Sequence, residues 1–437
     1  MTRLFNLLKD LEVPSLTTGI MIFALTLLVV AGSIGANAAT FEVNSTVDAV
    51  DDNPGDGICD DGSGNCTLRA AVMETNDLAG SDEIVLKSKT YVLTIPGPDA
   101  IAEKGDLDIR DDLLIQGQGT LETVIDGNLI TRVFHLLDGD DMNQIDVEVY
   151  DLTIRNSDAG NAGGGIRNVA EKLFLYRVAL ENNTSPRGAG LYNGPDGDTT
   201  IRDSVIFNNT ATGDPDMERG GGIYNKGELF LGNSTVSNNS AGDLGGGIFN
   251  EGSIHAAFST IADNTTESGL PGGVHTIFGG DLSLFANIIA DNNDGNCGGI
   301  LPTSQGFNIS SSNCNLNDPT DMPNTDPMIG PLQNNGGNTW THALLSSSPA
   351  IDMAGNEFAC FEVGADQRGI IRPQDGDQIG EAFCDAGAFE FKANLDSGEG
   401  GGCSIAKPGS SAPLPLYLLI PVFLLVIRLF RKQKINA

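Results

Sequence analysis

The phrase Gly163-Gly164-Gly165-Ile166-Arg167-Asn168 recurs along the middle of this chain and decides its fold. It returns as Gly-Ala-Gly-Leu-Tyr-Asn at 188–193, Gly-Gly-Gly-Ile-Tyr-Asn at 220–225 and Gly-Gly-Gly-Ile-Phe-Asn at 245–250, with a degraded copy, Gly-Gly-Val-His-Thr, at 272–276. Between the last glycines of the copies (165, 190, 222 and 247) the steps are 25, 32 and 25 residues. A period in this range indicates stacked structural units.

A second set of asparagines keeps step with the first, and each member closes an apolar segment: Asn183, Asn209, Asn239, Asn264 and Asn292. In the segments between the two sets of asparagines, the residues alternate with the period of a β-strand, as in Glu228–Leu231. We therefore expect an all-β chain, a right-handed parallel β-helix whose coils stack ~4.8 Å apart, with the handedness taken from the rule for parallel crossovers. Glycine and asparagine both tolerate tight corners, so the repeated residues are interpreted as corners, and ligand contact is the alternative.

Composition limits the functions that the chain can have. It has 437 residues, 56 glycines, 6% aromatic residues and a formal charge of −34. This charge argues against nucleic acid as a partner, because phosphate binding needs a basic patch. We expect no cofactor. Because the acidic charge permits divalent cations, Ca²⁺ is the alternative.

Both ends of the chain predict export and anchoring. Residues 1–38 look like a signal peptide, with an apolar run at 20–31 and a small-x-small cleavage pattern at Ala36 and Ala38; an N-terminal membrane anchor is the alternative. In an exported chain, six of the seven cysteines suggest local disulfides, although connectivity stays open: Cys59, Cys66, Cys297, Cys314, Cys360 and Cys384. Cys403 is left over.

Residues 39–82 are expected to cap the open end of the solenoid with a helix that begins after Thr67. The hexapeptide Cys66-Thr-Leu-Arg-Ala-Ala71 resembles that of the CSLREA domain of exported proteins, with Thr67 for Ser and Ala70 for Glu. The acidic run 51–61 invites a calcium interpretation. It departs from the EF-hand pattern at Pro54 and Ser63, which favours a solvated loop pinned by a disulfide.

Residues 83–300 are assigned to the β-helix repeats. They resemble the pectin-lyase-like right-handed β-helix superfamily, and the Gly-Gly-x-Ile and Phe207-Asn-Asn elements resemble the repeats of polymorphic outer-membrane proteins. Two insertions interrupt the repeat, at 194–198 and 213–218, and insertions of solenoids often lie on a binding face. Their acids are candidate ligands for a cation or another partner, although the two insertions fall at different corners of the coil: Asp196, Asp198, Asp214, Asp216 and Glu218.

Residues 301–395 form a block without the repeat. Ser348-Pro-Ala-Ile-Asp352, Asp366-Gln-Arg-Gly369 and Cys384-Asp-Ala-Gly-Ala-Phe-Glu390 resemble the choice-of-anchor Q domain of bacterial surface proteins, for which the motif establishes no activity. His342, Asp366 and Arg368 are interpreted either as a charged functional constellation or as a polar network that closes the end of the solenoid.

The C-terminus carries a linker (396–413) and a predicted membrane segment with a basic tail (414–437). Gly401, Gly402, Cys403 and Ser404 lie in a motif that resembles JDVT-CTERM sorting tails of Gram-negative bacteria. That resemblance implies a location in the cell envelope, recognition by a sorting protease and processing or lipid modification at Cys403. An unmodified thiol beside a permanent anchor is the alternative.

Three functions remain open. The first is non-catalytic binding or adhesion at the cell surface, with a glycan, the matrix or a neighbouring cell as the partner. The second is a polysaccharide lyase or glycoside hydrolase, although the chain shows no paired-carboxylate, nucleophile or histidine signature that we can defend. The third is a structural stalk. The sequence leans away from an enzyme without deciding the question.

Overall fold

The computed structural model describes residues 38–98, 100–139, 143–214, 217–355, 360 and 363–393. Nearly all of the predicted signal segment, the sorting motif at 401–404 and the predicted membrane segment lie outside these residues. Among the residues described, no helix is long and apolar enough to cross a bilayer.

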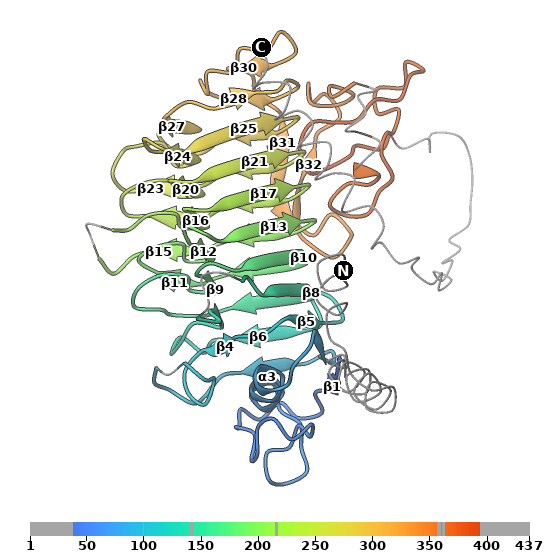
Figure 1. Ribbon diagram of the computed structural model, residues 1–437. Helices are drawn as coiled ribbons and strands as arrows, with labels where there is room; N and C mark the ends of the chain where they lie inside the picture. Colours follow the sequence, from blue (N-terminus) through green and yellow to red (C-terminus); the bar gives the residue numbers. More distant parts are fainter. Residues whose placement is uncertain are drawn as a thin grey trace, which may run out of the picture. The chain divides into compact units, whose positions relative to one another are not determined.

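The described chain winds into a parallel β-solenoid, as the repeat predicted, and successive coils lie directly above one another (Figure 1). A main sheet of 18 strands covers two flanks of each coil. Its first flank contains β1 (Thr40–Glu42), β2 (Asp82–Val85), β5 (Leu113–Gln116), β8 (Asp146–Arg155), β10 (Lys172–Glu181), β13 (Asp198–Arg202), β17 (Glu228–Gly232), β21 (Ser253–Ala257), β25 (Asp281–Phe285) and β28 (Thr303–Ser304). Strands β8 and β10 continue onto the second flank, which also contains β3 (Thr90–Val92), β6 (Val124–Asp126), β14 (Val205–Phe207), β18 (Thr235–Ser237), β22 (Thr260–Ala262), β26 (Ile288–Ala290), β29 (Ile309–Ser310) and β30 (Met322–Pro323).

A second sheet closes the third side of the coil, and a small sheet lies at one corner. The second sheet contains β4 (Leu107–Ile109), β7 (Phe134–Leu136), β9 (Ile166–Asn168), β12 (Leu191–Asn193), β16 (Ile223–Asn225), β20 (Ile248–Asn250), β24 (Val274–Thr276) and β27 (Cys297–Gly299). The small sheet contains β11 (Thr184–Ser185), β15 (Thr210–Ala211), β19 (Ser240–Ala241) and β23 (Thr265–Thr266). The ladder thus runs from Thr40 to Pro323, beyond the 83–300 assigned to repeats, because coils that lack the Gly-Asn phrase also pair.

The register places like residues above like. Ile166, Leu191, Ile223, Ile248 and Val274 form one inward column, and each is at most 1% exposed. The corner asparagines form a second column, in which the Asn183 amide donates to Asn209 Oδ1 (2.9 Å), Asn209 to Asn239 (2.9 Å) and Asn239 to Asn264 (3.0 Å). The repeated asparagines are therefore corner residues whose amides are used by the fold.

Separate segments plug the two ends of the core. At the N-terminal end, helix α3 (Leu68–Asp77) is capped by the Thr67 hydroxyl, which accepts from the Ala70 amide at 3.0 Å, and its Leu68 and Val72 join the solenoid core. At the C-terminal end, the loop 311–321 buries Cys314 and Leu316 in that same core.

The C-terminal block, residues 326–393, does not close the end of the solenoid, which corrects one of the two interpretations above. It begins with the antiparallel hairpin β31 (Ile329–Gln333) and β32 (Thr341–Leu344) and lies along the coils, as Figure 1 shows. The block reaches the coil of β8 through the Asn338 side-chain amide, which donates to Asp151 Oδ1 (3.1 Å). It reaches the coil of β22 through the Ala388 backbone amide, which donates to Thr260 Oγ1 (3.1 Å). The loop 311–321 already occupies the end, so the outward face of the second flank is what remains for the block to cover.

Three disulfides pin the non-repetitive segments: Cys59–Cys66, Cys297–Cys314 and Cys360–Cys384. These are the three near pairs of the sequence. One holds the N-terminal loop beside α3, one holds the C-terminal plug to β27, and one lies within the C-terminal block.

Candidate functional site

An aromatic platform, which we define as Tyr150, Phe174 and Tyr176, lies on the outward face of the first flank. Alternation along β10 creates it, because Leu173 and Leu175 point into the core (at most 2% exposed) while Phe174 and Tyr176 point out and remain partly exposed. The register places Tyr150 of β8 beside Tyr176. The ring centroids lie 5.7 Å (Tyr150–Phe174), 5.7 Å (Tyr150–Tyr176) and 6.1 Å (Phe174–Tyr176) apart, which is normal aromatic packing.

Charged groups border the platform. The Tyr150 hydroxyl donates to Glu148 at 2.5 Å, and the Arg177 guanidinium lies 4.4 Å from the centroid of the Tyr176 ring. Arg177 is held there by Asp151 (Nε–Oδ1 2.6 Å), which also accepts from Asn338 of the C-terminal block. Burial and the nearby Asp203 carboxylate raise the pKa of Tyr176 above its ordinary value.

This arrangement combines flat apolar faces with fixed acceptors and a fixed donor. Partly exposed rings beside oriented polar groups are typical of small-molecule and carbohydrate recognition, because the rings supply contact area and the polar groups supply orientation. The platform was not predicted from the sequence. The available signal was the alternation of aromatic residues within Lys172–Tyr176, one coil above Tyr150.

A second cluster lies at the N-terminal end of the second sheet. Asp108 of β4 and His135 of β7 face each other across the ladder, with His135 Nδ1 2.9 Å from Asp108 Oδ1. Asp106 Oδ2 lies 4.0 Å from the same nitrogen and 2.6 Å from Arg132 Nη1. Burial raises the pKa of Asp108, and its bond to His135 opposes that rise. Asp108 and His135 are 27 positions apart, and only the coil register brings them together.

The acids predicted from the insertions are distributed over different parts of the coil. Asp198 begins β13 between Lys172 and Glu228 of the neighbouring coils, and burial, followed by the Glu228 carboxylate, raises its pKa. Asp196 lies in the preceding turn. Glu218 accepts from the Gly213 amide at 2.8 Å, in the loop that also contains Asp214. Asp216 lies outside the described residues.

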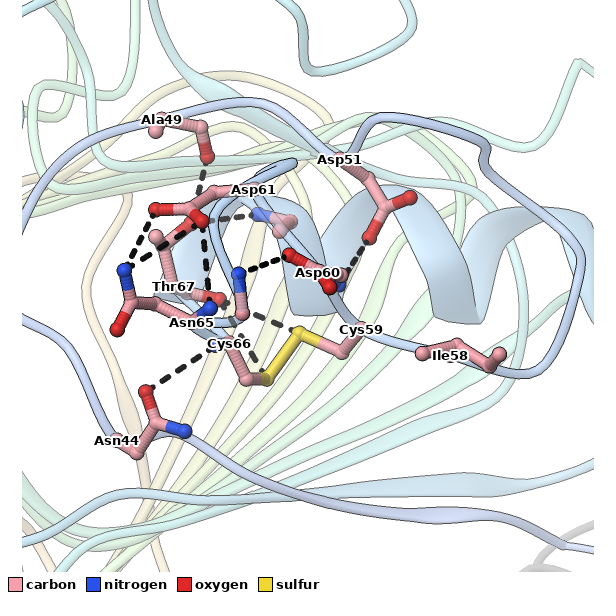
Figure 2. The surroundings of a disulfide bond; sticks show 12 residues. Asn44, Ala49, Asp51, Ile58, Cys59, Asp60, Asp61, Asn65, Cys66 and Thr67 are labelled. Atoms are coloured by element: carbon pink, nitrogen blue, oxygen red, sulfur yellow. Dashed lines mark hydrogen bonds between the residues drawn. A yellow bond between two sulfur atoms is a disulfide. The ribbon is translucent and has the colours of Figure 1, made fainter.

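In the acidic loop near the first disulfide, the carboxylates accept hydrogen bonds from within the loop itself, as Figure 2 shows. Asp51 accepts from the amides of Asn53 (2.9 Å) and Asp60 (3.0 Å), and Asp60 accepts from Gly62 (2.9 Å). The Ser63 hydroxyl donates to Asp61 at 2.6 Å and lowers the pKa of that carboxyl. These bonds agree with a loop pinned by a disulfide.

Of the three residues singled out in the C-terminal block, the structure brings Asp366 and Arg368 together and places His342 apart from them. Arg368 pairs with Asp366 at 2.6 Å, whereas His342 bonds to Ser237 Oγ (2.9 Å) and to the Gly330 carbonyl (2.7 Å). Arg368 also lies 3.4 Å from the centroid of the Phe389 ring. Both sets hold the block together or to the solenoid.

No protein-family model matches the chain, and no curated protein matches it. A solved structure that resembles it is the crystal structure of pectate lyase Pel9A, at 12% identity and a TM-score of 0.41, covering 82% of this chain and 98% of that one. A likeness this distant says nothing about the activity of this chain. The resemblances to the CSLREA domain, the choice-of-anchor Q domain and the sorting tail stay predictions.

Proposed function

We propose that this chain is an exported β-helix protein of a Gram-negative cell envelope that binds a glycan without cleaving it, through the aromatic platform. The single observation that carries the proposal is the set of three partly exposed rings held within about 6 Å of one another. The apolar C–H faces of a sugar would lie on the rings, and Glu148 and Arg177 would accept from and donate to its hydroxyl groups.

Three features of the chain are consistent with glycan binding outside the cytoplasm. Sheet strands on both sides fix Tyr150 and Tyr176, so little ordering is required on binding. The net charge of −34 favours a neutral or cationic glycan over a polyanionic one. The three disulfides are consistent with an oxidising compartment outside the cytoplasm.

The test is a panel of soluble polysaccharides presented to the full-length chain, with and without Ca²⁺. Saturable binding measured by calorimetry, with no new reducing ends and no unsaturated products, would support the proposal. Product formation would instead establish the lyase or hydrolase alternative. Absence of both binding and products would leave the structural stalk.

One observation bears on the lyase alternative. A lyase needs a base beside clustered acids, and Arg132 is paired with Asp106, which lies in a cluster with Asp108 and His135. The Arg132 side chain is only 8% exposed, and it is bonded to Asp106 and to the carbonyl oxygens of Ala162 and Gly163. A polysaccharide cannot reach a guanidinium held in this way, so Arg132 does not provide the base that a lyase needs.

A further inference from the structure

We propose that Asp106, Asp108 and His135 form a binding site for a divalent transition metal of the zinc type. One carboxylate oxygen from each aspartate and one imidazole nitrogen all lie within 4.8 Å of one another. The three side chains come from adjacent coils, Asp106 and Asp108 from the segment that forms β4 and His135 from β7. This site is independent of the aromatic platform.

The distances suit one ion among three ligands. Zinc binds nitrogen and carboxylate oxygen at about 2.0–2.1 Å, so ligand atoms at tetrahedral angles stand about 3.4 Å apart. His135 Nδ1 is 2.9 Å from Asp108 Oδ1 and 4.0 Å from Asp106 Oδ2, which brackets that separation. Shifts of about half an ångström would place all three around an ion.

The ligand types indicate which metal would bind. Imidazole nitrogen together with carboxylate oxygen suits Zn²⁺ and its first-row neighbours, whereas Ca²⁺ prefers six or more oxygen ligands. The side chains of Asp106, Asp108 and His135 are 12%, 3% and 13% exposed, so the site is largely sheltered while Asp106 and His135 keep some contact with solvent.

The surroundings hold the ligands in place. Asp108 Oδ2 accepts from the Ala102 amide at 3.3 Å, and Arg69 fixes that loop by donating to the carbonyl oxygens of Ala102 (2.7 Å) and Gly105 (2.8 Å). Arg132 bonds to Asp106, but a carboxylate offers about four lone-pair positions, so Arg132 can remain as an outer partner. Arg167 follows His135 in the ladder, and its charge would weaken the affinity for a cation.

Calorimetric titration of the full-length chain with Zn²⁺ tests the site, after treatment with a chelator and with Cys403 alkylated so that its thiol cannot bind zinc. We expect one Zn²⁺ per chain, no competition from excess Ca²⁺, and an affinity at least tenfold weaker in Asp108→Asn and in His135→Gln. Asp377→Asn is the matched control, because it removes a carboxylate from the cluster of Asp352, Asp375 and Asp377, which lacks a histidine.

Absence of Zn²⁺ binding, binding unchanged in both site variants, or loss of binding in Asp377→Asn would each overturn the proposal. The visible absorption spectrum of the Co²⁺-loaded wild-type chain is a readout that needs no variant. The proposal requires that this spectrum show the absorption bands of a cobalt ion bound by few ligands. If a site variant fails to fold, the wild-type Co²⁺ spectrum and its displacement by Zn²⁺ decide the outcome.

Discussion

Ser237 Oγ and His342 Nε2 lie 2.9 Å apart although 105 positions separate them in the chain. Ser237 ends strand β18 of the solenoid, and His342 lies on β32 of the C-terminal block. The side chain of His342 is fully buried, and its other ring nitrogen bonds to the Gly330 carbonyl. The block is therefore attached to the side of the coils through a neutral, fully bonded imidazole.

This contact predicts a dependence on pH. Burial lowers the pKa of His342 below the ordinary value of 6.5. The unfolded chain therefore takes up a proton near pH 6.5 that the folded chain does not, and the contribution of His342 to stability falls as the pH drops through that value. His342→Gln removes this group, so the difference in unfolding free energy between wild type and variant should shrink between about pH 8 and pH 5.5. Chemical denaturation at both pH values measures it, and a constant difference would contradict the prediction.

The asparagine column predicts a large effect from one buried amide. Asn239 donates to Asn264 (3.0 Å) and to the Ile206 carbonyl (2.9 Å), and it accepts from the Asn209 side chain (2.9 Å). Asn239→Ala leaves buried partners unpaired at roughly 1–3 kcal/mol each, so we expect a loss of about 3 kcal/mol or more. Denaturant unfolding measures it. Thr210→Ala, on the exposed face of β15, is the control and should cost under about 0.5 kcal/mol.

Substitution of Gly220, a glycine of the repeated phrase, should lower stability for two reasons: backbone strain and a steric clash. Gly220 has φ +65°, and a Cβ there would lie 2.3 Å from the Ile223 carbonyl oxygen. Gly269 has φ +76° but open space around it. Gly269→Ala should cost only the backbone strain of about 1–2 kcal/mol, whereas Gly220→Ala should cost clearly more. Equal losses in unfolding free energy would mean that the close approach is unimportant.

The platform predicts a selective loss of binding. Phe174→Ala and Tyr176→Ala each remove a ring, and a lost stacking contact of about 1–1.5 kcal/mol corresponds to an affinity roughly tenfold weaker. Phe278→Ala removes a ring that is 94% exposed, in the turn after β24, and should leave glycan binding unchanged. Calorimetry on all three variants distinguishes glycan binding at the platform from non-specific binding to exposed aromatic rings.

Much of the fold could be predicted from the sequence because the solenoid repeats its corners. The Gly-Asn phrase fixes where each coil turns, and the alternation in Glu228–Leu231 fixes which side chains enter the core. The C-terminal plug carried no such signal. Leu316 lies in a segment without periodicity, and its burial depends on the path of residues 311–321 across the end of the core.

The candidate sites were harder to predict for a related reason. Asp108 and His135 occupy the same position in successive coils, but the coils that contain them lack the Gly-Asn phrase, so their register could not be read. The side-on attachment of the C-terminal block was equally hidden. It depends on outward-facing residues such as Ser237 and Thr235, which look like any polar position of an exposed strand.

The plug predicts that the second disulfide matters more than the first. Cys297–Cys314 closes a segment of 17 residues and holds Cys314 and Leu316 in the core, whereas Cys59–Cys66 closes only seven at the edge of the N-terminal loop. Restricting a loop of about 15 residues stabilises a fold by about 3 kcal/mol, and shorter loops contribute less. The double substitution of Cys297 and Cys314 by Ser should therefore lower the melting temperature more than the double substitution of Cys59 and Cys66 does.

The double substitution of Cys297 and Cys314 should also increase amide hydrogen exchange in β27 and β29, because an unplugged end exposes the last coil to water. Exchange in β12 and β16 should stay unchanged. If exchange in β27 and β29 were the same in this variant as in the wild type, Leu316 would hold the plug without its disulfide.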